Sequence, residues 1–122
     1  MAHAPYKAIP KFKSKMEQDY WWHLEARRQD EEIQAYCYEA FSVCVGRDEK
    51  GHRRMYTPDF LVILDNGEIE FHETKGSKNA RGQQTAMQRL YAAHELYGHF
   101  RWVFVERKRD GFWRLLRVGD GE

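Results

Sequence analysis

Cysteine is scarce in this sequence, which holds only two among its 122 residues, Cys37 and Cys44. Two cysteines are too few for the disulfide framework of a small secreted domain. We interpret residues 35–45, which are rich in aromatic and β-branched side chains, as a single strand. The two cysteines are an odd number of positions apart, so on that strand they face opposite sides and cannot form a disulfide. The sequence therefore predicts two half-buried thiols in a reducing compartment.

Long hydrophobic runs are also missing. No apolar run approaches the roughly 20 residues that a membrane-spanning helix needs. Residues 1–15 carry lysines but no apolar stretch of the kind found in a secretory signal. We therefore expect no membrane association and a cytoplasmic location. Hydrophobic residues make up 42% and charged residues 32% of the chain, which is typical of a globular protein, and the length suffices for one domain.

An excess of charge of either sign is lacking too, because the formal net charge is only +1. The charges are nevertheless unevenly placed. Between Arg54 and Lys75 the only charged residues are acids. Only bases precede Glu17, and only bases occur from Thr74 to His94. An acidic centre between basic stretches is typical of a nuclease, which must hold a metal ion and attract phosphate. Ordinary solvated charge on a neutral protein explains the same pattern equally well.

The first clear element is a helix that begins after Ser14. In Ser14-Lys15-Met16-Glu17, Ser14 is the expected N-cap and Glu17 the acid of a capping box, and the helix is expected to end between residues 30 and 34. The other predicted elements are strands at residues 35–45, 56–64 and 68–75, a helix at 83–97, and strands at 99–107 and 112–118. Asp65-Asn66-Gly67 and Asp110-Gly111 are predicted hairpin turns. The order α-β-β-β-α-β-β predicts an α/β or α+β fold with a mixed central sheet flanked by helices.

Three ionisable side chains are expected to meet at one end of the hairpin formed by residues 56–75. Alternate residues of a strand share a face, so Glu73 and Lys75 point the same way, and His72 points to the opposite face, where we expect a structural role. Counted outward from the turn, Asp59 lies roughly opposite Glu73 and Lys75. Carboxylates beside apolar strand residues are unfavourable unless a cation compensates them.

The two acids and a backbone carbonyl, that of Thr74, suit Mg²⁺, which prefers hard oxygen ligands. Lys75 then orients or deprotonates an attacking water, or stabilises charge that develops on a phosphate. The alternative is structural: Glu73 and Lys75 form a cross-strand ion pair, and Asp59 caps a turn.

At these residues the chain resembles the PD-(D/E)XK nuclease superfamily. Pro58-Asp59 matches the first half of the signature of that superfamily, and Glu73-Thr74-Lys75 matches the second half. The longer string from Tyr56 to Leu61, followed by Glu73 to Gly76, is similar to Holliday junction resolvases of the bacteriophage endonuclease I type. The likeness extends from about Ser14 to Gly76, roughly half of the chain.

This resemblance implies a restriction-endonuclease-like core in residues 14–122, preceded by a basic arm at residues 1–13. It implies hydrolysis with Mg²⁺, or with Mn²⁺ in its place, that leaves 5′-phosphate and 3′-hydroxyl ends. It also implies a homodimer that acts on branched DNA, in the host cytoplasm if a phage encodes the chain. The superfamily commonly adds an acid from the first helix, and Glu17 matches that position. Glu17 is equally explained as a capping residue.

Basic and polar residues on both sides of the acidic centre are candidates for contacts with DNA. They are Lys11, Lys13 and Lys15 in the first segment, and Lys78, Arg81 and Gln84 near the start of the second helix. A solvated surface explains them as well. Two other functions remain open from the sequence: a nicking or restriction-type DNA endonuclease, and a catalytically silent DNA-binding module that keeps the nuclease fold.

Overall fold

The computed structural model describes residues 8–75 and 80–119, and for residues 80–84 it describes the backbone alone. Within these segments the chain forms two helices and seven strands. In chain order they are α1 (Lys15–Gln29), β1 (Ile33–Tyr38), β2 (Val43–Arg47), β3 (Arg53–Tyr56), β4 (Phe60–Leu64), β5 (Ile69–Thr74), α2 (Ala80–Leu96), β6 (Arg101–Arg107) and β7 (Trp113–Arg117). The order predicted from the sequence is wrong, because two of its strands are each divided. The mixed sheet with helices is confirmed.

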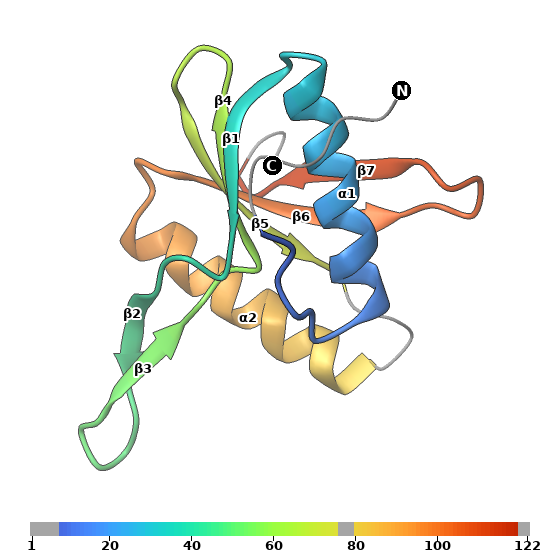
Figure 1. Cartoon of the computed structure of the whole chain (residues 1–122). Helices are drawn as coiled ribbons and strands as arrows, with labels where there is room; N and C mark the ends of the chain where they lie inside the picture. Colours follow the sequence, from blue (N-terminus) through green and yellow to red (C-terminus); the bar gives the residue numbers. More distant parts are fainter. Residues whose placement is uncertain (1–7, 76–79, 120–122) are drawn as a thin grey trace.

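Five strands form the main sheet in the order β1-β4-β5-β6-β7, while β2 and β3 form a separate hairpin. Among the described strands of this sheet only β5 and β6 pair in parallel, and α2 provides the crossover that such a pair needs; the other pairs are antiparallel. Helix α1 packs on one face of the sheet and α2 lies on the other (Figure 1). Neither described helix is long and apolar enough to cross a membrane.

The strand predicted at residues 35–45 is interrupted at Glu39, which has a φ of 49°. A non-glycine residue in this left-handed region breaks the extended chain, so β1 joins the main sheet and β2 turns away to pair with β3. Cys37 and Cys44 therefore lie in different sheets, and the prediction that they face opposite sides of one strand is wrong. Both are partly buried thiols that form no disulfide with each other.

The strand predicted at residues 56–64 is also divided, with Pro58 in the gap. Proline has no N–H to donate to a strand ladder, and β3 ends before it while β4 starts after it. Asp59 consequently stands directly before β4 instead of inside a strand. β4 lies between β1 and β5, in the interior of the main sheet.

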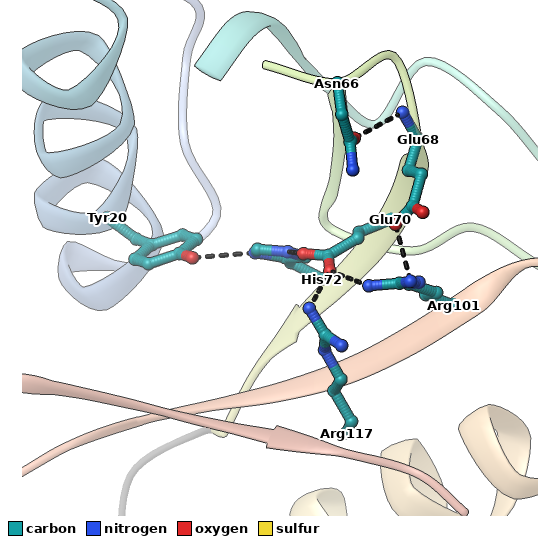
Figure 2. Close-up of polar contacts among 7 residues, drawn as sticks. All are labelled: Tyr20, Asn66, Glu68, Glu70, His72, Arg101 and Arg117. Carbon is teal, nitrogen blue, oxygen red and sulfur yellow. Dashed lines mark hydrogen bonds and ion pairs between the residues drawn. The ribbon is translucent and has the colours of Figure 1, made fainter. Parts of the chain in front are cut away.

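Both predicted hairpin turns are present. Gly67 has a φ of 89° and Gly111 a φ of 91°, a conformation that glycine adopts without a steric penalty. The Asn66 side chain accepts a hydrogen bond of 3.0 Å from the Glu68 backbone N–H, which closes the first turn (Figure 2). This turn sets the β4–β5 register, in which Phe60 faces His72.

The core has two layers, one on each face of the main sheet. On the α1 face, Tyr20, Trp21 and Leu24 pack against apolar residues of the strands. On the α2 face, Leu90 and Ala93 pack against Phe71, Trp102 and Phe104. The β2–β3 hairpin contributes Val43 and Tyr56 to this second layer and is thereby attached to the body of the protein.

A buried polar chain joins α1 to β5 on the first face (Figure 2). Tyr20 and His72 have no exposed surface, and the Tyr20 hydroxyl lies 2.7 Å from His72 Nδ1. His72 Nε2 lies 2.9 Å from Glu70 Oε1, and Glu70 also pairs with Arg117 and Arg101. Burial lowers the pKa of His72 despite the neighbouring carboxylate, so the ring is neutral at pH 7, with Tyr20 donating to Nδ1 and Nε2–H donating to Glu70. The prediction that His72 is structural and faces away from Glu73 is confirmed.

Candidate metal-binding site

Asp59 is held against the end of β5 by Thr74. The register that pairs Phe60 with His72 brings Asp59 beside Glu73. The backbone N–H and the hydroxyl of Thr74 both donate to Asp59 Oδ2, over 2.9 and 2.7 Å. Two donors on one oxygen fix the carboxylate in place and leave its other oxygen for a different partner.

Glu73 shares the site with Asp59. Its side chain is nearly buried, at 9% exposed, and its Oε1 accepts a hydrogen bond of 2.5 Å from the Tyr56 hydroxyl. Burial, followed by the charge of Asp59, raises the pKa of Glu73 to about 9. Burial also raises the pKa of Asp59, to about 6. At pH 7 without a cation, Glu73 therefore holds a proton, because this nearly buried carboxyl group cannot ionise cheaply beside the carboxylate of the partly buried Asp59.

Glu17 brings a third carboxylate from the first turn of α1. Its backbone N–H donates to Ser14 Oγ, which confirms the predicted N-cap. Its carboxylate accepts hydrogen bonds from the Ser14 hydroxyl at 2.7 Å and from the Tyr38 hydroxyl at 2.6 Å. The charge of Glu17 raises the pKa of both Asp59 and Glu73, which places it at the same cluster. Glu17 thus caps the helix through its backbone N–H and its contact with Ser14, and its carboxylate also belongs to the acid cluster.

Glu39 is a fourth acid, and the sequence analysis did not find it. The Glu39 backbone N–H donates to the Asp59 carbonyl at 2.8 Å, which continues the β1–β4 pairing past the end of β1. Carboxylate oxygens of Glu17, Glu39 and Asp59 lie within 4.8 Å of one another. Only the pairing of β1 with β4, which no local pattern reveals, could have indicated Glu39.

Lysine side chains stand on both sides of this acid cluster of Glu17, Glu39, Asp59 and Glu73. Lys13, one of the predicted DNA contacts, is largely exposed, and its Nζ lies 2.7 Å from Glu39 Oε2 at the edge of the cluster. Lys75 Nζ donates to Glu106 Oε2 at 2.9 Å. The alternation of β5 puts Lys75 on the same face of the sheet as Glu73, but its ammonium is held by β6.

The other predicted DNA contacts are less informative. Lys15 pairs with Asp19 on α1, and Lys11 is exposed. Lys78 and the side chains of Arg81 and Gln84 lie outside the described part of the chain.

Comparisons with protein-family models, with curated proteins and with solved structures found no match to this chain. The function must therefore be argued from the chemistry of the site. Four carboxylates supply only hard oxygen ligands, which suit Mg²⁺ or Mn²⁺ and do not suit a thiolate-seeking metal. Burial and the charge of Asp59 raise the pKa of Glu73, and a divalent ion bound to these carboxylates would take the place of the proton on Glu73.

The stability of the metal-free protein is expected to fall as pH rises. The folded pKa of Glu73, about 9, lies above its ordinary value of 4.5, so the folded state binds the proton more tightly than the unfolded state does. This contribution to stability is complete below pH 4.5 and is lost as pH approaches 9. In EDTA, the free energy of unfolding of the wild type is expected to fall between pH 5 and pH 9. In Glu73→Gln this fall is expected to be smaller by about 2 kcal/mol. Urea denaturation at each pH measures the free energy of unfolding. Glu95→Gln changes an exposed residue of α2 and should show the same dependence on pH as the wild type.

Tyr56 is expected to tune the affinity of the site for a metal ion. Its hydroxyl orients Glu73 and stabilises the ionised form that a cation needs. Tyr56→Phe is expected to weaken Mg²⁺ binding about tenfold, as measured by calorimetry. Tyr36→Phe is the matched control, because Tyr36 is also buried and donates to a carboxylate, that of Glu25. Equal Mg²⁺ affinities in the wild type and Tyr56→Phe would contradict the assignment.

Proposed function

We propose that this chain is a Mg²⁺-dependent endonuclease that hydrolyses phosphodiester bonds in DNA, with branched DNA such as a four-way junction as its substrate. The observation that supports it most is the convergence of Glu17, Glu39 and Asp59 from three separate segments, with carboxylate oxygens within 4.8 Å of one another and with Glu73 beside Asp59. Buried clusters of like charge are unfavourable by themselves, and metal-dependent phosphodiester hydrolysis gives them a role.

Asp59 and Glu73, with the Thr74 carbonyl, would hold the metal ion, and Glu17 would add an outer carboxylate. When bound, the ion polarises the phosphate and lowers the pKa of a water molecule. Thr74 keeps Asp59 in position through two hydrogen bonds, and Tyr56 orients Glu73. Lys75 lies two residues after Glu73 and on the same face of the sheet. An approaching phosphate competes with Glu106 for its ammonium group. Once released, that ammonium donates hydrogen bonds to the attacking water or to a phosphate oxygen.

The ion pair between Lys75 and Glu106 also favours a second candidate, a silent DNA-binding module with this fold. In that case Lys75 serves to join β5 to β6 and takes no part in chemistry. A silent module would bind DNA without turnover in Mg²⁺ or Mn²⁺.

Among nucleases, a nicking or restriction-type enzyme differs from a junction resolvase because it cuts linear duplex as readily as a junction. A homodimer remains part of the proposal, and sedimentation of the protein with and without DNA tests it.

The test is a cleavage assay with a four-way junction and a linear duplex of the same arms, in Mg²⁺, in Mn²⁺ and in EDTA. We expect cuts in the junction with either metal ion and none in EDTA. Lys75→Ala is expected to lower the rate about a hundredfold, the loss typical of removing one charge-stabilising donor. Lys108→Ala, an exposed lysine in the β6–β7 turn, is the matched control. Full activity in Lys75→Ala, or no cleavage by the wild type under any condition, would exclude the proposed mechanism.

A further inference from the structure

A groove separates the β2–β3 hairpin from helix α2. The hairpin extends outward from the body of the protein, at an angle to the helix, and β2 contacts α2 (Figure 1). The groove encloses about 390 Å³. Its polar lining consists of Arg54 from the hairpin and Thr85, Gln88 and Arg89 from α2, and Val45 and Met55 add apolar surface. The α2 residues recur at helical spacing, so one continuous stripe of the helix faces the hairpin.

The walls of this groove are firmly attached to the body of the protein. The Tyr97 hydroxyl, just after α2, donates to the Cys44 carbonyl of β2 at 2.7 Å. Val43 and Tyr56 at the base of the hairpin pack in the same core layer as Leu90 of the helix. A groove between anchored walls can bind a partner without first ordering its own backbone.

The charge of the groove is positive. Arg54 and Arg89 are exposed, and among residues 8–75 and 85–119 no carboxylate forms an ion pair with either guanidinium group. The stripe of α2 adds hydrogen-bonding side chains between them. Guanidinium groups with amide and hydroxyl neighbours are the usual partners of phosphate oxygens.

The groove is also next to the acid cluster. Arg54 and Tyr56 are two residues apart on β3, and the Tyr56 hydroxyl donates to Glu73. Tyr56 packs in the same core layer as Leu90, the residue that follows Arg89 on α2. One tyrosine side chain therefore separates the positive groove from the proposed metal ligands.

We propose that this groove binds the phosphodiester backbone of the DNA strand that enters the acid cluster, with Arg54 and Arg89 each contacting a phosphate. The inference rests on the proposed function, since it assigns the groove to the substrate of that site. It gives the β2–β3 hairpin a role as a rigid wall that holds the strand against α2. The contacts are to phosphates, so they position the DNA and carry no sequence preference.

The experiment measures binding of a fluorescent four-way junction by anisotropy, in Ca²⁺ and over a range of KCl concentrations. The double variant Arg54→Ala/Arg89→Ala is expected to weaken binding at least about tenfold. The slope of the logarithm of the binding constant against the logarithm of the KCl concentration should become less steep by about two. The variant Arg54→Lys/Arg89→Lys keeps both charges and should retain the slope. Lys108→Ala/Arg109→Ala removes two exposed charges from the β6–β7 turn and should match the wild type. Circular dichroism melting verifies that each variant is folded.

An unchanged salt slope in the folded alanine variant would overturn the groove proposal, even if the wild type cleaves DNA. A reduced slope without any cleavage by the wild type would keep the groove and overturn the nuclease. Displacement of the junction by polyglutamate at the same concentration of charge would show that the groove accepts any polyanion, which also contradicts a phosphate site.

Discussion

Asp59→Asn is expected to abolish Mg²⁺-dependent cleavage, with a loss of at least about a thousandfold, while the protein remains folded. The asparagine side-chain oxygen can still accept the two hydrogen bonds from Thr74, so the local structure is retained. The variant loses the negative charge that a divalent cation requires. It also loses repulsion within the acid cluster, because Asp59 raises the pKa of Glu73. The metal-free variant should therefore be at least as stable as the wild type.

The rate of junction cleavage and the melting temperature in EDTA together test this prediction. Asp110→Asn is the matched control, because Asp110 also accepts a backbone hydrogen bond through its side chain, from Phe112 in the β6–β7 turn. Glu39→Gln, measured in parallel, tests the acid that only the structure reveals. A folded Asp59→Asn protein that cleaves at the wild-type rate would rule out Asp59 as a metal ligand.

His72→Leu is expected to destabilise the protein by about 3 kcal/mol, more than a hundredfold in the folding equilibrium. The substitution leaves the buried hydroxyl of Tyr20 without its partner and removes the hydrogen bond that His72 donates to Glu70. Tyr20 has no exposed surface and Glu70 is only 4% exposed, so solvent does not readily replace either hydrogen bond. Urea denaturation at pH 7 measures the change. An effect below about 0.5 kcal/mol, which is usual for surface substitutions, would show that the buried chain contributes little.

Two further variants separate the hydrogen bonds from packing. His52→Leu changes a histidine whose side chain is 75% exposed, and it should be nearly neutral. Tyr20→Phe removes the hydroxyl alone. If the chain works as a unit, Tyr20→Phe destabilises the wild type but has little effect on the His72→Leu protein, since that hydroxyl has already lost its partner.

The central part of the candidate site could be predicted because local rules determine it. Asn66-Gly67 specifies a tight turn, the turn sets the register of β4 against β5, and the register brings Asp59 to Glu73. The alternation of β5 likewise places His72 on the face opposite Glu73 without any long-range information. Ser14 and Glu17 define the start of α1 through their own hydrogen bonds.

The remaining features depend on contacts between distant segments. The interruption at Glu39 requires a left-handed residue inside a run of strand-forming side chains, and no turn residue marks it. Glu39 reaches Asp59 only because β1 pairs with β4. Lys75 meets Glu106 across the parallel β5–β6 pair, 31 residues further along the chain. Hydrophobic pattern and turn residues do not encode such pairings, so the partner of Lys75 could not be predicted.

The parallel pairing of β5 and β6 has a kinetic consequence. The β4–β5 hairpin can close early because its strands are adjacent in sequence, whereas β6 can join β5 only after α2 has crossed over the sheet. In a nascent or partly refolded chain, Asp59 would therefore meet Glu73 before Lys75 meets Glu106 of β6. If the proposed function holds, such a chain would assemble part of its acid cluster early, and the lysine would take its final place only at the last stage of folding.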